Sequence, residues 1–392
     1  MRTQVAIIGA GPAGLVLAHL LSLRGIDSVV LERQTRAHIE ARIRAGVLEQ
    51  GTVALLEQCG LAERLMRERM VHDGLELLFD GVGHRIPLTE LTGTPITIYG
   101  QHELVKDLVA ARLTRGPLLF EVSRVEVDPV APLVTFTHEG EHHELGCDFV
   151  AGCDGFHGVS RPSIPDGGLR VFEHDYPFAW LGILAQAPPS SEELIYGYHQ
   201  RGFALHSMRS PMLTRLYLQV PPDEELGRWP DERIWEELRL RLARDHDNGD
   251  GWELADGPIV ERSITGLRSF VADPMRYGHL FLAGDAAHIV PATGAKGLNL
   301  AVADVAVLAE AFEEFFHNGR RALLDSYSET CLRRVWRVQH FSWWMTSMLH
   351  RMPDADLFTE QLQLSQLRYV TSSHAAATSF AENYVGLPLK GV

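Results

Sequence analysis

The sequence predicts an α/β fold with α+β character: a parallel-sheet domain, an inserted antiparallel sheet and a C-terminal helical region. A short apolar run at residues 4–8 leads into a glycine-rich turn and a helical pattern, as at the start of a βαβ unit. Residues 176–270 contain a series of short strand-like segments, and residues 300–349 have the pattern of helices. We therefore expect a first domain at 1–175, completed by the segment around 268–300. A mainly antiparallel domain follows at 176–267, and the helical region spans 286–392.

The composition limits the partners of the protein. The chain has 392 residues and a formal net charge of −15, which argues against nucleic acid or an anionic membrane surface. No apolar run reaches the ~18 residues of a membrane span, and the first residues pass straight into a strand, unlike a signal peptide. The four cysteines show neither a disulfide framework nor metal-binding spacing, so we expect no metal and a cytoplasmic location; they are Cys59, Cys147, Cys153 and Cys331.

Gly9, Gly11 and Gly14 form a G-x-G-x-x-G turn between the first strand and a helix expected at residues 15–24. The first glycine permits the tight turn, the second lets the backbone approach a pyrophosphate, and the third lets the helix pack on the strand. The next strand, at 28–31, ends at Glu32, where an acid accepts a ribose hydroxyl. The pattern predicts a Rossmann-like dinucleotide site. A glycine-rich turn without a ligand is the alternative, and it does not account for Glu32.

Two further segments carry groups that suit such a ligand. Arg42 and Arg44 follow the ribose-binding position, where cations neutralise a pyrophosphate, although a solvated helix face is the alternative. A buried strand at 281–283 precedes Asp285, and a helix begins near Leu298. A carboxylate at a strand end suits a polyol hydroxyl, and the peptide N–H groups of a helix N-terminus suit a developing negative charge.

Strands and helices are expected along the rest of the chain. The expected strands are 75–79, 96–99, 120–127, 133–136, 143–145, 148–152, 178–184, 194–196, 203–208 and 215–220. The expected helices are 49–59, 101–113, 234–242, 300–317 and 322–349.

Ser207 and Arg209 lie on one expected strand, and Arg215 and Tyr217 lie on the next. Residues i and i+2 of a strand point to the same face, so these four side chains can converge. A guanidinium and two hydroxyls offer a carboxylate bidentate pairing and two further donors. A solvent-exposed sheet face is the other interpretation of this spacing.

Three motifs occur in order along the chain: Gly9-x-Gly11-x-x-Gly14, Cys153-Asp154-Gly155 and Gly284-Asp285. Longer strings accompany them at residues 42–51, 207–209, 268–270, 295–299, 341–346 and 383–388. With these motifs the whole chain resembles the single-component FAD-dependent aromatic hydroxylases, and in particular those acting on 4-hydroxybenzoate.

This resemblance implies FAD as cofactor and NADPH (NADH possible) and O2 as co-substrates. The implied reaction is hydroxylation of 4-hydroxybenzoate at C3 to 3,4-dihydroxybenzoate (protocatechuate) through a flavin C4a-hydroperoxide. It also implies a homodimer, and an apolar cluster at residues 341–348 is either core or subunit contact. Two alternatives stay open: an FAD hydroxylase for another hydroxybenzoate or phenol, and a non-catalytic flavin-binding sensor.

The resemblance also assigns roles to residues. Tyr196 takes a hydrogen bond from the substrate phenol, and Tyr384 passes the proton toward His72 and solvent. An unperturbed histidine titrates near neutrality, which suits an exit. The alternative on sequence alone is a pair of core tyrosines and a surface histidine.

The remaining assignments concern the substrate and the two cofactors. Those for the substrate are Ser207, Arg209 and Tyr217 at the carboxylate, and the backbone carbonyl of Ala292 at the hydroxyl. Those for FAD are Gly9, Gly11, Gly14, Glu32, Arg42, Arg44, Gln101, Arg215, Asp285, Leu298 and Asn299. Those for NADPH are Arg33, His38, Arg44, His157 and Arg268.

Three positions depart from the family's usual residues. Ala292 replaces a second proline after Pro291, which removes a fixed φ and predicts a looser loop. His38 stands where a tyrosine is often found; Arg33 and Arg36 nearby can compensate, so NADPH is favoured over NADH. Ala13 replaces a serine and so lacks one pyrophosphate donor. In the loop before Leu298, Lys296 is an electrostatic helper for a reduced flavin or, alternatively, a solvated lysine.

Overall fold

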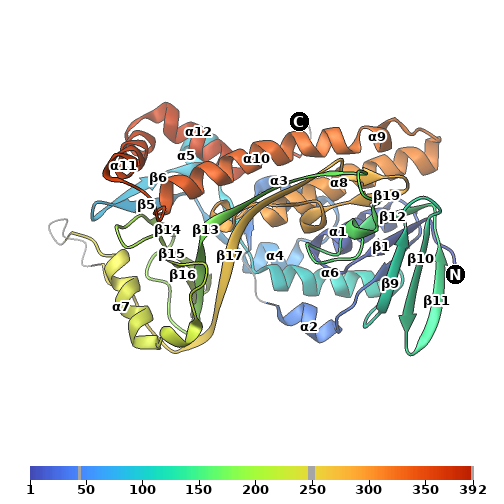
Figure 1. Ribbon diagram of the computed structural model, residues 1–392, viewed down its shortest axis with the longest axis horizontal. Coiled ribbons are helices and arrows are strands. Elements are labelled where there is room, and N and C mark those ends of the chain that lie inside the picture. Colours follow the sequence, from blue (N-terminus) through green and yellow to red (C-terminus); the bar gives the residue numbers. More distant parts are fainter. Residues whose placement is uncertain (43–45, 246–251, 390–392) are drawn as a thin grey trace.

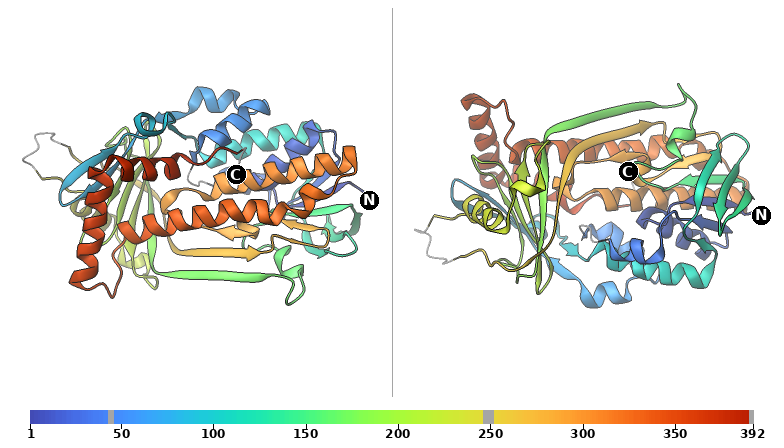
Figure 2. Two further views of the ribbon diagram at one scale, coloured as in Figure 1. Left: turned by 90° about the horizontal axis from the view of Figure 1, so that it is seen from above. Right: turned by 60° about the horizontal axis from the view of Figure 1, so that its bottom comes forward.

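Figure 1 shows the computed structural model of the chain, which describes residues 1–42, 46–245 and 252–389. Two large sheets occupy the two halves of an elongated molecule. Two long helices, α8 (Gly297–Asn318) and α10 (Tyr327–Leu349), run along one side, and α10 reaches both halves (Figures 1 and 2). The predicted α/β class is confirmed.

The sheet near the N-terminus has the strand order β18-β19-β12-β1-β2-β8. Every residue of β1 is buried, which is why its sequence is a continuous apolar run. Strands β19, β12, β1 and β2 run parallel with Leu282, Gly152, Ile8 and Leu31 in one row. The segments that follow these residues therefore meet at one sheet edge. The strands are β1 (Val5–Ile8), β2 (Ser28–Leu31), β8 (Leu118–Leu119), β12 (Phe149–Gly152), β18 (Arg276–Tyr277) and β19 (Leu280–Leu282).

Helices cover this sheet. The helix α1 (Pro12–Leu23) packs on α6 (Gln101–Arg115) and α8. It begins three residues earlier than expected, because Pro12 has the φ of a first helical turn and Gly11 caps the helix. The short helices around it are α2 (Arg36–Ala41), α3 (Gln50–Gln58) and α4 (Glu63–Glu68).

Two three-stranded sheets flank the parallel sheet. Strands β9 (Ser123–Asp128), β10 (Leu133–His138) and β11 (Glu141–Gly146) form the expected antiparallel meander. Strands β3 (Val47–Leu48), β7 (Ile96–Ile98) and β4 (Met70–His72) form the other, with β7 in the centre.

The second large sheet has the order β20-β17-β13-β16-β15-β14-β5-β6 and is mostly antiparallel. It draws strands from outside residues 176–267: β5 pairs in parallel with β14, and β13 and β17 extend to 170 and 273. A hydrophobic strand such as β14 is stabilised by a partner on its open edge, and β5 supplies one. The strands are β5 (Leu75–Phe79), β6 (Val82–Ile86), β13 (Arg170–Ala185), β14 (Leu194–Gly197), β15 (Ala204–Ser210), β16 (Leu213–Val220), β17 (Ile259–Asp273) and β20 (His288–Ile289).

The other helices lie near this sheet or follow it. The helix expected at 322–349 is divided into α9 (Ala322–Asp325) and α10, because Ser326, at φ −88° and ψ 0°, departs from helical geometry. The remaining helices are α5 (Leu88–Thr92), α7 (Asp231–Arg241), α11 (Leu357–Ser372) and α12 (His374–Val385). Short 3₁₀ turns include η4 (Gly284–Ala286) and η5 (Ala292–Gly294).

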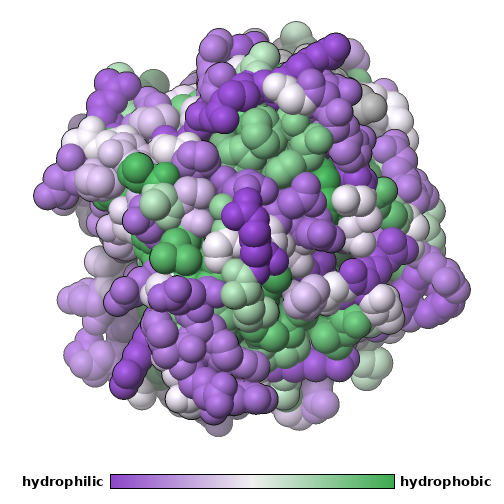
Figure 3. All heavy atoms as spheres, turned by 90° about the vertical axis from the view of Figure 1, so that its right-hand side faces the viewer, coloured by the Kyte–Doolittle hydropathy of each residue, from purple (hydrophilic) through white to green (hydrophobic). Residues whose placement is uncertain are grey.

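The surface differs between the two ends of the molecule. On the end in Figure 3, hydrophilic residues predominate and separate smaller hydrophobic patches. The other end carries α11, whose exposed side chains include Leu357 and Phe358. Within the described residues, no helix combines the length and apolar character of a bilayer span.

Candidate functional site

The glycine turn after β1 has the geometry that a dinucleotide requires. Gly9 has φ +100°, and a Cβ there would lie 2.5 Å from the carbonyl oxygen of Cys153. A Cβ on Gly14 would clash with the carbonyl oxygen of Gly9, so α1 can pack here only on a glycine. A Cβ on Gly11 would meet no atom within 4 Å. The open space at Gly11 fits a pyrophosphate against the backbone.

Glu32 supports this turn directly. Its carboxylate is buried and accepts hydrogen bonds from the backbone N–H of Ala10, at 2.7 Å, and of Gln34, at 2.8 Å. The side chain thus holds the turn between β1 and α1 in place. Its expected contact with a ribose stays a prediction.

The three glycines lead to a matched pair of variants. We expect Gly14→Ala to destabilise the apoprotein strongly, because its Cβ has no space. Gly11→Ala should leave the melting temperature of the apoprotein almost unchanged but weaken FAD binding about tenfold or more, since the methyl group enters the ligand's space. Thermal unfolding and flavin titration measure the two effects. Equal FAD affinity in Gly11→Ala and wild type would contradict this placement.

The turn after β19 lies next to the glycine turn, since a Cβ on Gly284 would be 3.4 Å from Cβ of Ala13 and 3.2 Å from Cβ of Ala301 in α8. Asp285 lies half-buried in η4, and Leu298 is half-buried in the first turn of α8. The buried Asn299 side chain accepts from the N–H of Glu49 at 2.9 Å and donates to the carbonyl of Val47 at 2.9 Å. It therefore anchors the segment between β3 and α3. A backbone role for Asn299 at the flavin stays a prediction.

Lys296 is not a solvated lysine. Its side chain is 2% exposed, and its ammonium lies 2.8 Å from a carboxylate oxygen of Glu49 and 2.5 Å from the carbonyl oxygen of Tyr384. The alternative interpretation from sequence is therefore wrong. The lysine links the loop before α8 to α12. It contributes a buried positive charge beside the N-terminus of α8.

The strand register brings the predicted substrate residues onto one face of the large sheet. Tyr196 lies opposite Leu205, and Leu205 lies opposite Tyr217. Two residues further along β15, and so on the same face, Ser207 lies opposite Arg215. Ser207 and Arg215 are buried, so this face is not solvent-exposed.

Arg209 lies at an irregularity in the ladder between β15 and β16, where bulges redirect side chains. Its Nη1 donates to Ser207 Oγ at 3.2 Å and to the Met208 carbonyl at 2.8 Å. Its buried Nε has no hydrogen-bond partner among the described residues. Burial lowers the pKa of Arg209, and the neighbouring Tyr217 and Tyr196 hydroxyls partly oppose this shift. An anion at Nε would satisfy this donor and offset the desolvation of the charge.

Arg215 makes different contacts. Its guanidinium pairs with Glu261 at 3.1 Å and lies 5.2 Å from the centre of the Tyr217 ring. Glu261 thus holds the Arg215 guanidinium against one face of the Tyr217 ring. The flavin contact expected for Arg215 stays a prediction.

Tyr196 and Tyr384 form the predicted pair. Their hydroxyl oxygens are 2.7 Å apart, and each residue is only 1% exposed. Burial raises the pKa of both phenols above the ordinary value. The two hydroxyls are thus neutral at physiological pH, and adjacent neutral hydroxyls can pass a proton between them.

His72 differs from the expectation. It is 2% exposed, and burial lowers its pKa to about 4, partly opposed by Glu193 and Asp73. The expectation of titration near neutrality is therefore wrong, as is the alternative of a surface histidine. No hydrogen bond joins Tyr384 to His72 within the described ranges. At neutral pH His72 is an uncharged proton acceptor whose Nδ1 lacks a described partner.

This shift predicts a pH effect on stability. Between pH about 6.5 and about 4, unfolded His72 binds a proton that the folded residue does not, so falling pH destabilises the fold across this window. We expect His72→Gln to remove about 2 kcal/mol of this loss between pH 7 and pH 5. Urea unfolding at pH 7 and pH 5 measures it. His206 and His350 are present in both proteins, so identical pH slopes would contradict the effect of His72.

The residues predicted for the nicotinamide cofactor lie in two places. Arg268 lies 4.9 Å from the centre of the Phe156 ring, which also contacts the His157 ring at a centroid distance of 4.9 Å. Arg33 and His38 are exposed at and before α2. The structure thus brings Arg268 and His157 together through Phe156.

Four other predicted positions need mention. Arg44 lies outside the described residues. Arg42 is exposed and is the last described residue before residues 43–45. Gln101 is the first residue of α6. The carbonyl of Ala292 already accepts a hydrogen bond from the N–H of Ala295 at 3.0 Å, so it has one lone pair left for a substrate.

Three interactions were not predicted from the sequence. Glu49 is the partner of Lys296, and a lone acid in the apolar string at residues 46–49 was a signal for it. His288 and Asp304 form a buried contact of 2.6 Å next to η4. Trp180 donates from Nε1 to His350 Nε2 at 2.7 Å on the same sheet face as Tyr217, whose ring centre lies 4.7 Å from its own, with no signal in the local pattern.

Comparison with known proteins gives the family. The FAD binding domain family matches residues 2–342. The p-hydroxybenzoate hydroxylase of Acinetobacter baylyi is 49% identical over 392 residues, 99% of this chain and 96% of that protein. A 3-(3-hydroxy-phenyl)propionate/3-hydroxycinnamic acid hydroxylase of Burkholderia cenocepacia is 27% identical, with 79% of this chain and 56% of that protein covered.

Solved structures agree in fold. The crystal structure of p-nitrophenol 4-monooxygenase from Pseudomonas putida DLL-E4 superposes with a TM-score of 0.84 at 18% identity, covering 98% of this chain and 99% of that one. The expected cofactor, FAD, follows from the family match and fits the open glycine turn. The chain therefore belongs to the FAD-binding-domain family and, within it, to the flavin-dependent aromatic monooxygenases that include p-hydroxybenzoate hydroxylase.

Proposed function

We propose that the protein hydroxylates 4-hydroxybenzoate at C3 to 3,4-dihydroxybenzoate with NADPH and O2. One observation carries this proposal: Arg209, with an unpartnered buried N–H, lies beside Tyr196, whose hydroxyl contacts Tyr384. A cation with a buried N–H and a nearby pair of buried hydroxyls suit the two ends of a para-hydroxylated aromatic acid. The name of the Acinetobacter relative supports the same substrate.

In this proposal Arg209, Ser207 and Tyr217 bind the carboxylate end of the substrate. Arg209 offers Nε, and the neighbouring Tyr217 offers a hydroxyl. The Ser207 hydroxyl donates to the carbonyl of Arg215, at 2.9 Å, and must rotate to donate to the carboxylate. The Leu205 side chain, in the register row between Tyr196 and Tyr217, provides apolar surface for the ring. This arrangement holds the ring in a single orientation and excludes water from it.

At the other end, Tyr196 accepts the hydrogen bond of the substrate phenol and donates its own to Tyr384. Loss of the phenol proton makes the ring electron-rich at the carbon next to the hydroxyl. Because both tyrosines have raised pKa values, they move the proton without holding negative charge themselves. The neutral imidazole of His72 is the proposed acceptor beyond them.

Reduced FAD, when bound, supplies the activation of O2 and the oxygen transfer. The proposed contacts of the chain with it are Gly11 at the pyrophosphate, Glu32 at a ribose, Asp285 at the ribityl chain and the first turn of α8 at the ring. Lys296 adds a buried positive charge near that turn, and Glu49 pairs with it.

NADPH is the proposed reductant. Arg268 and His157 around Phe156 suit its pyrophosphate, and the exposed Arg33 and His38 suit a 2′-phosphate. NADH stays an outcome of the test rather than a second proposal.

The decisive assay follows oxidation of NADPH and of NADH by the purified holoenzyme with a panel of hydroxybenzoates and identifies the products. We expect 4-hydroxybenzoate to stimulate oxidation and to yield 3,4-dihydroxybenzoate. Turnover only with another hydroxybenzoate or phenol would overturn the substrate. A yellow protein that oxidises neither nucleotide with any ring would be a flavin-binding sensor.

We also propose that the protein is a cytoplasmic homodimer that associates through α11. On this helix Leu357 is 81% exposed, Phe358 70% and Leu362 55%, a cluster that is typical of an interface. Free thiols at all four cysteines suit a reducing compartment.

We expect Phe358→Asp to shift the protein from dimer to monomer in sedimentation velocity, whereas Leu323→Asp, exposed on α9, should not. A wild-type monomer at micromolar concentration would refute the dimer.

A further inference from the structure

The carboxylate of Asp304 occupies a buried position between the two segments, η4 and the start of α8, that are proposed to contact FAD. Asp304 lies in α8, two turns beyond its N-terminus, and is 1% exposed. One of its oxygens, Oδ2, accepts the backbone N–H of Gly284 at 2.9 Å and lies 2.6 Å from Nε2 of His288. The turn η4, strand β20 and helix α8 therefore meet at a single atom.

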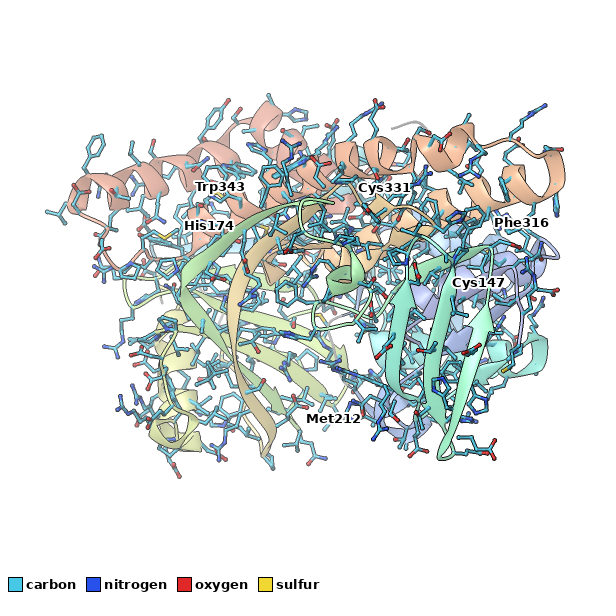
Figure 4. The ribbon with its side chains drawn as sticks, turned by 45° about the vertical axis from the view of Figure 1, so that its right-hand side comes forward. Cys147, His174, Met212, Phe316, Cys331 and Trp343 are labelled. Carbon is cyan, nitrogen blue, oxygen red and sulfur yellow. The ribbon has the colours of Figure 1, made fainter. Side chains whose placement is uncertain are left out.

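His288 compensates the charge of Asp304. The imidazole is 2% exposed; burial lowers its pKa, but the carboxylates of Asp304 and Asp285 outweigh burial and the net shift is upward. A buried carboxylate is costly unless it is paired and hydrogen-bonded, and here it is both. Cys331 of α10, labelled in Figure 4, is also close, but burial and Asp304 keep it a neutral thiol.

The Gly284 turn has little space to move on its other side. Gly284 has φ +63°, and a Cβ on it would lie 3.2 Å from Cβ of Ala301 in α8 and 3.4 Å from Cβ of Ala13 in α1. The turn is thus packed between two helices, and its N–H is held by Asp304. Because Asp285 follows Gly284 directly, the direction of the Asp285 side chain depends on this contact.

We propose that Asp304 is a positioning residue for FAD, with His288 as its counter-charge. Through one carboxylate oxygen it fixes the turn that carries Asp285 relative to the helix whose first turn carries Leu298. The two segments then present their groups at a constant separation. The inference rests on the proposed placement of FAD against Asp285 and the start of α8.

Flavin titration of the apoprotein tests this role. We expect Asp304→Asn to raise the Kd for FAD about tenfold, because the amide keeps the bond to Gly284 but loses the charge paired with His288. Asp304→Ala should raise the Kd further. The gain in melting temperature on adding FAD should shrink in both variants, and the absorption spectrum of bound flavin should shift.

Tyr327→Phe is the matched control. It removes a buried hydroxyl that donates to the carbonyl of Leu282, at 2.8 Å, near the same turn. We expect it to lower the melting temperatures of apoprotein and holoprotein equally and to change the Kd less than twofold. If Asp304→Asn behaves like this control, Asp304 is only structural and the proposal is overturned. Should Asp304→Ala not fold, Asp304→Asn decides alone; a wild-type apoprotein that binds no FAD would instead refute the cofactor placement.

Discussion

Replacing Arg209 with alanine is expected to raise the Kd for 4-hydroxybenzoate by about 30-fold or more, with a smaller effect on turnover at saturating substrate. Removing one partner of a buried charge pair costs about 2 to 5 kcal/mol. Arg209 meets that condition, since its Nε is buried and without a described partner, and the acceptors of its Nη1, Ser207 Oγ and the Met208 carbonyl, carry no charge. Arg209→Lys should also bind weakly, because an ammonium cannot pair bidentately.

Equilibrium binding, measured by the perturbation of the flavin spectrum, gives the affinity independently of turnover. Arg262→Ala is the matched control: this arginine lies on β17 of the same sheet but pairs on the surface with Asp231, at 2.8 Å. Phenols without a carboxylate should bind equally to Arg209→Ala and wild type. An unchanged affinity for 4-hydroxybenzoate would place the carboxylate elsewhere.

Tyr196→Phe is expected to reduce hydroxylation by about 10²- to 10⁴-fold while leaving substrate affinity almost unchanged. The variant removes the hydroxyl that lies 2.7 Å from Tyr384, and it keeps the ring that packs in the core. The phenol proton then has no buried acceptor, so the ring stays less reactive. Reduced nucleotide should still be consumed, but with little 3,4-dihydroxybenzoate formed per mole.

Product analysis against nucleotide consumption separates this effect from lost binding. Tyr176→Phe serves for comparison, since Tyr176 is also buried and its hydroxyl contacts Ser269, at 3.2 Å, away from Tyr384. Tyr176→Phe should form as much 3,4-dihydroxybenzoate per mole of nucleotide consumed as the wild type does. Full coupling in Tyr196→Phe would mean that the proton leaves by another route.

Much of the fold could be predicted because its signals are local. The apolar run of β1, the three glycines and Glu32 lie within a single βαβ unit, and the strand at 28–31 was predicted to the residue. Boundaries were less certain where one residue changes the geometry, as Pro12 does at the start of α1 and Ser326 before α10. The contribution of β5 and β6 to the large sheet could not be predicted, because strand pairing depends on which edge is open.

The candidate site was only partly predictable. Spacing along the strands placed Ser207 and Arg215 on one face, which the register confirms. Local spacing does not determine burial. For this reason Lys296 could be either an electrostatic helper or a solvated lysine, and His72 was expected to titrate near neutrality. Both depend on the segments that cover them.

The sequence by itself determined the α/β class, the dinucleotide turn and the types of side chain available to the site, because periodicity and glycine placement act over a few neighbouring residues. Only the tertiary structure decided which of these groups meet. Tyr196 contacts Tyr384 across 188 residues, and Lys296 pairs with Glu49 across 247. Burial and pairing of charges arise when distant segments pack together and exclude water, and the pKa of His72 and the free donor of Arg209 follow from that exclusion.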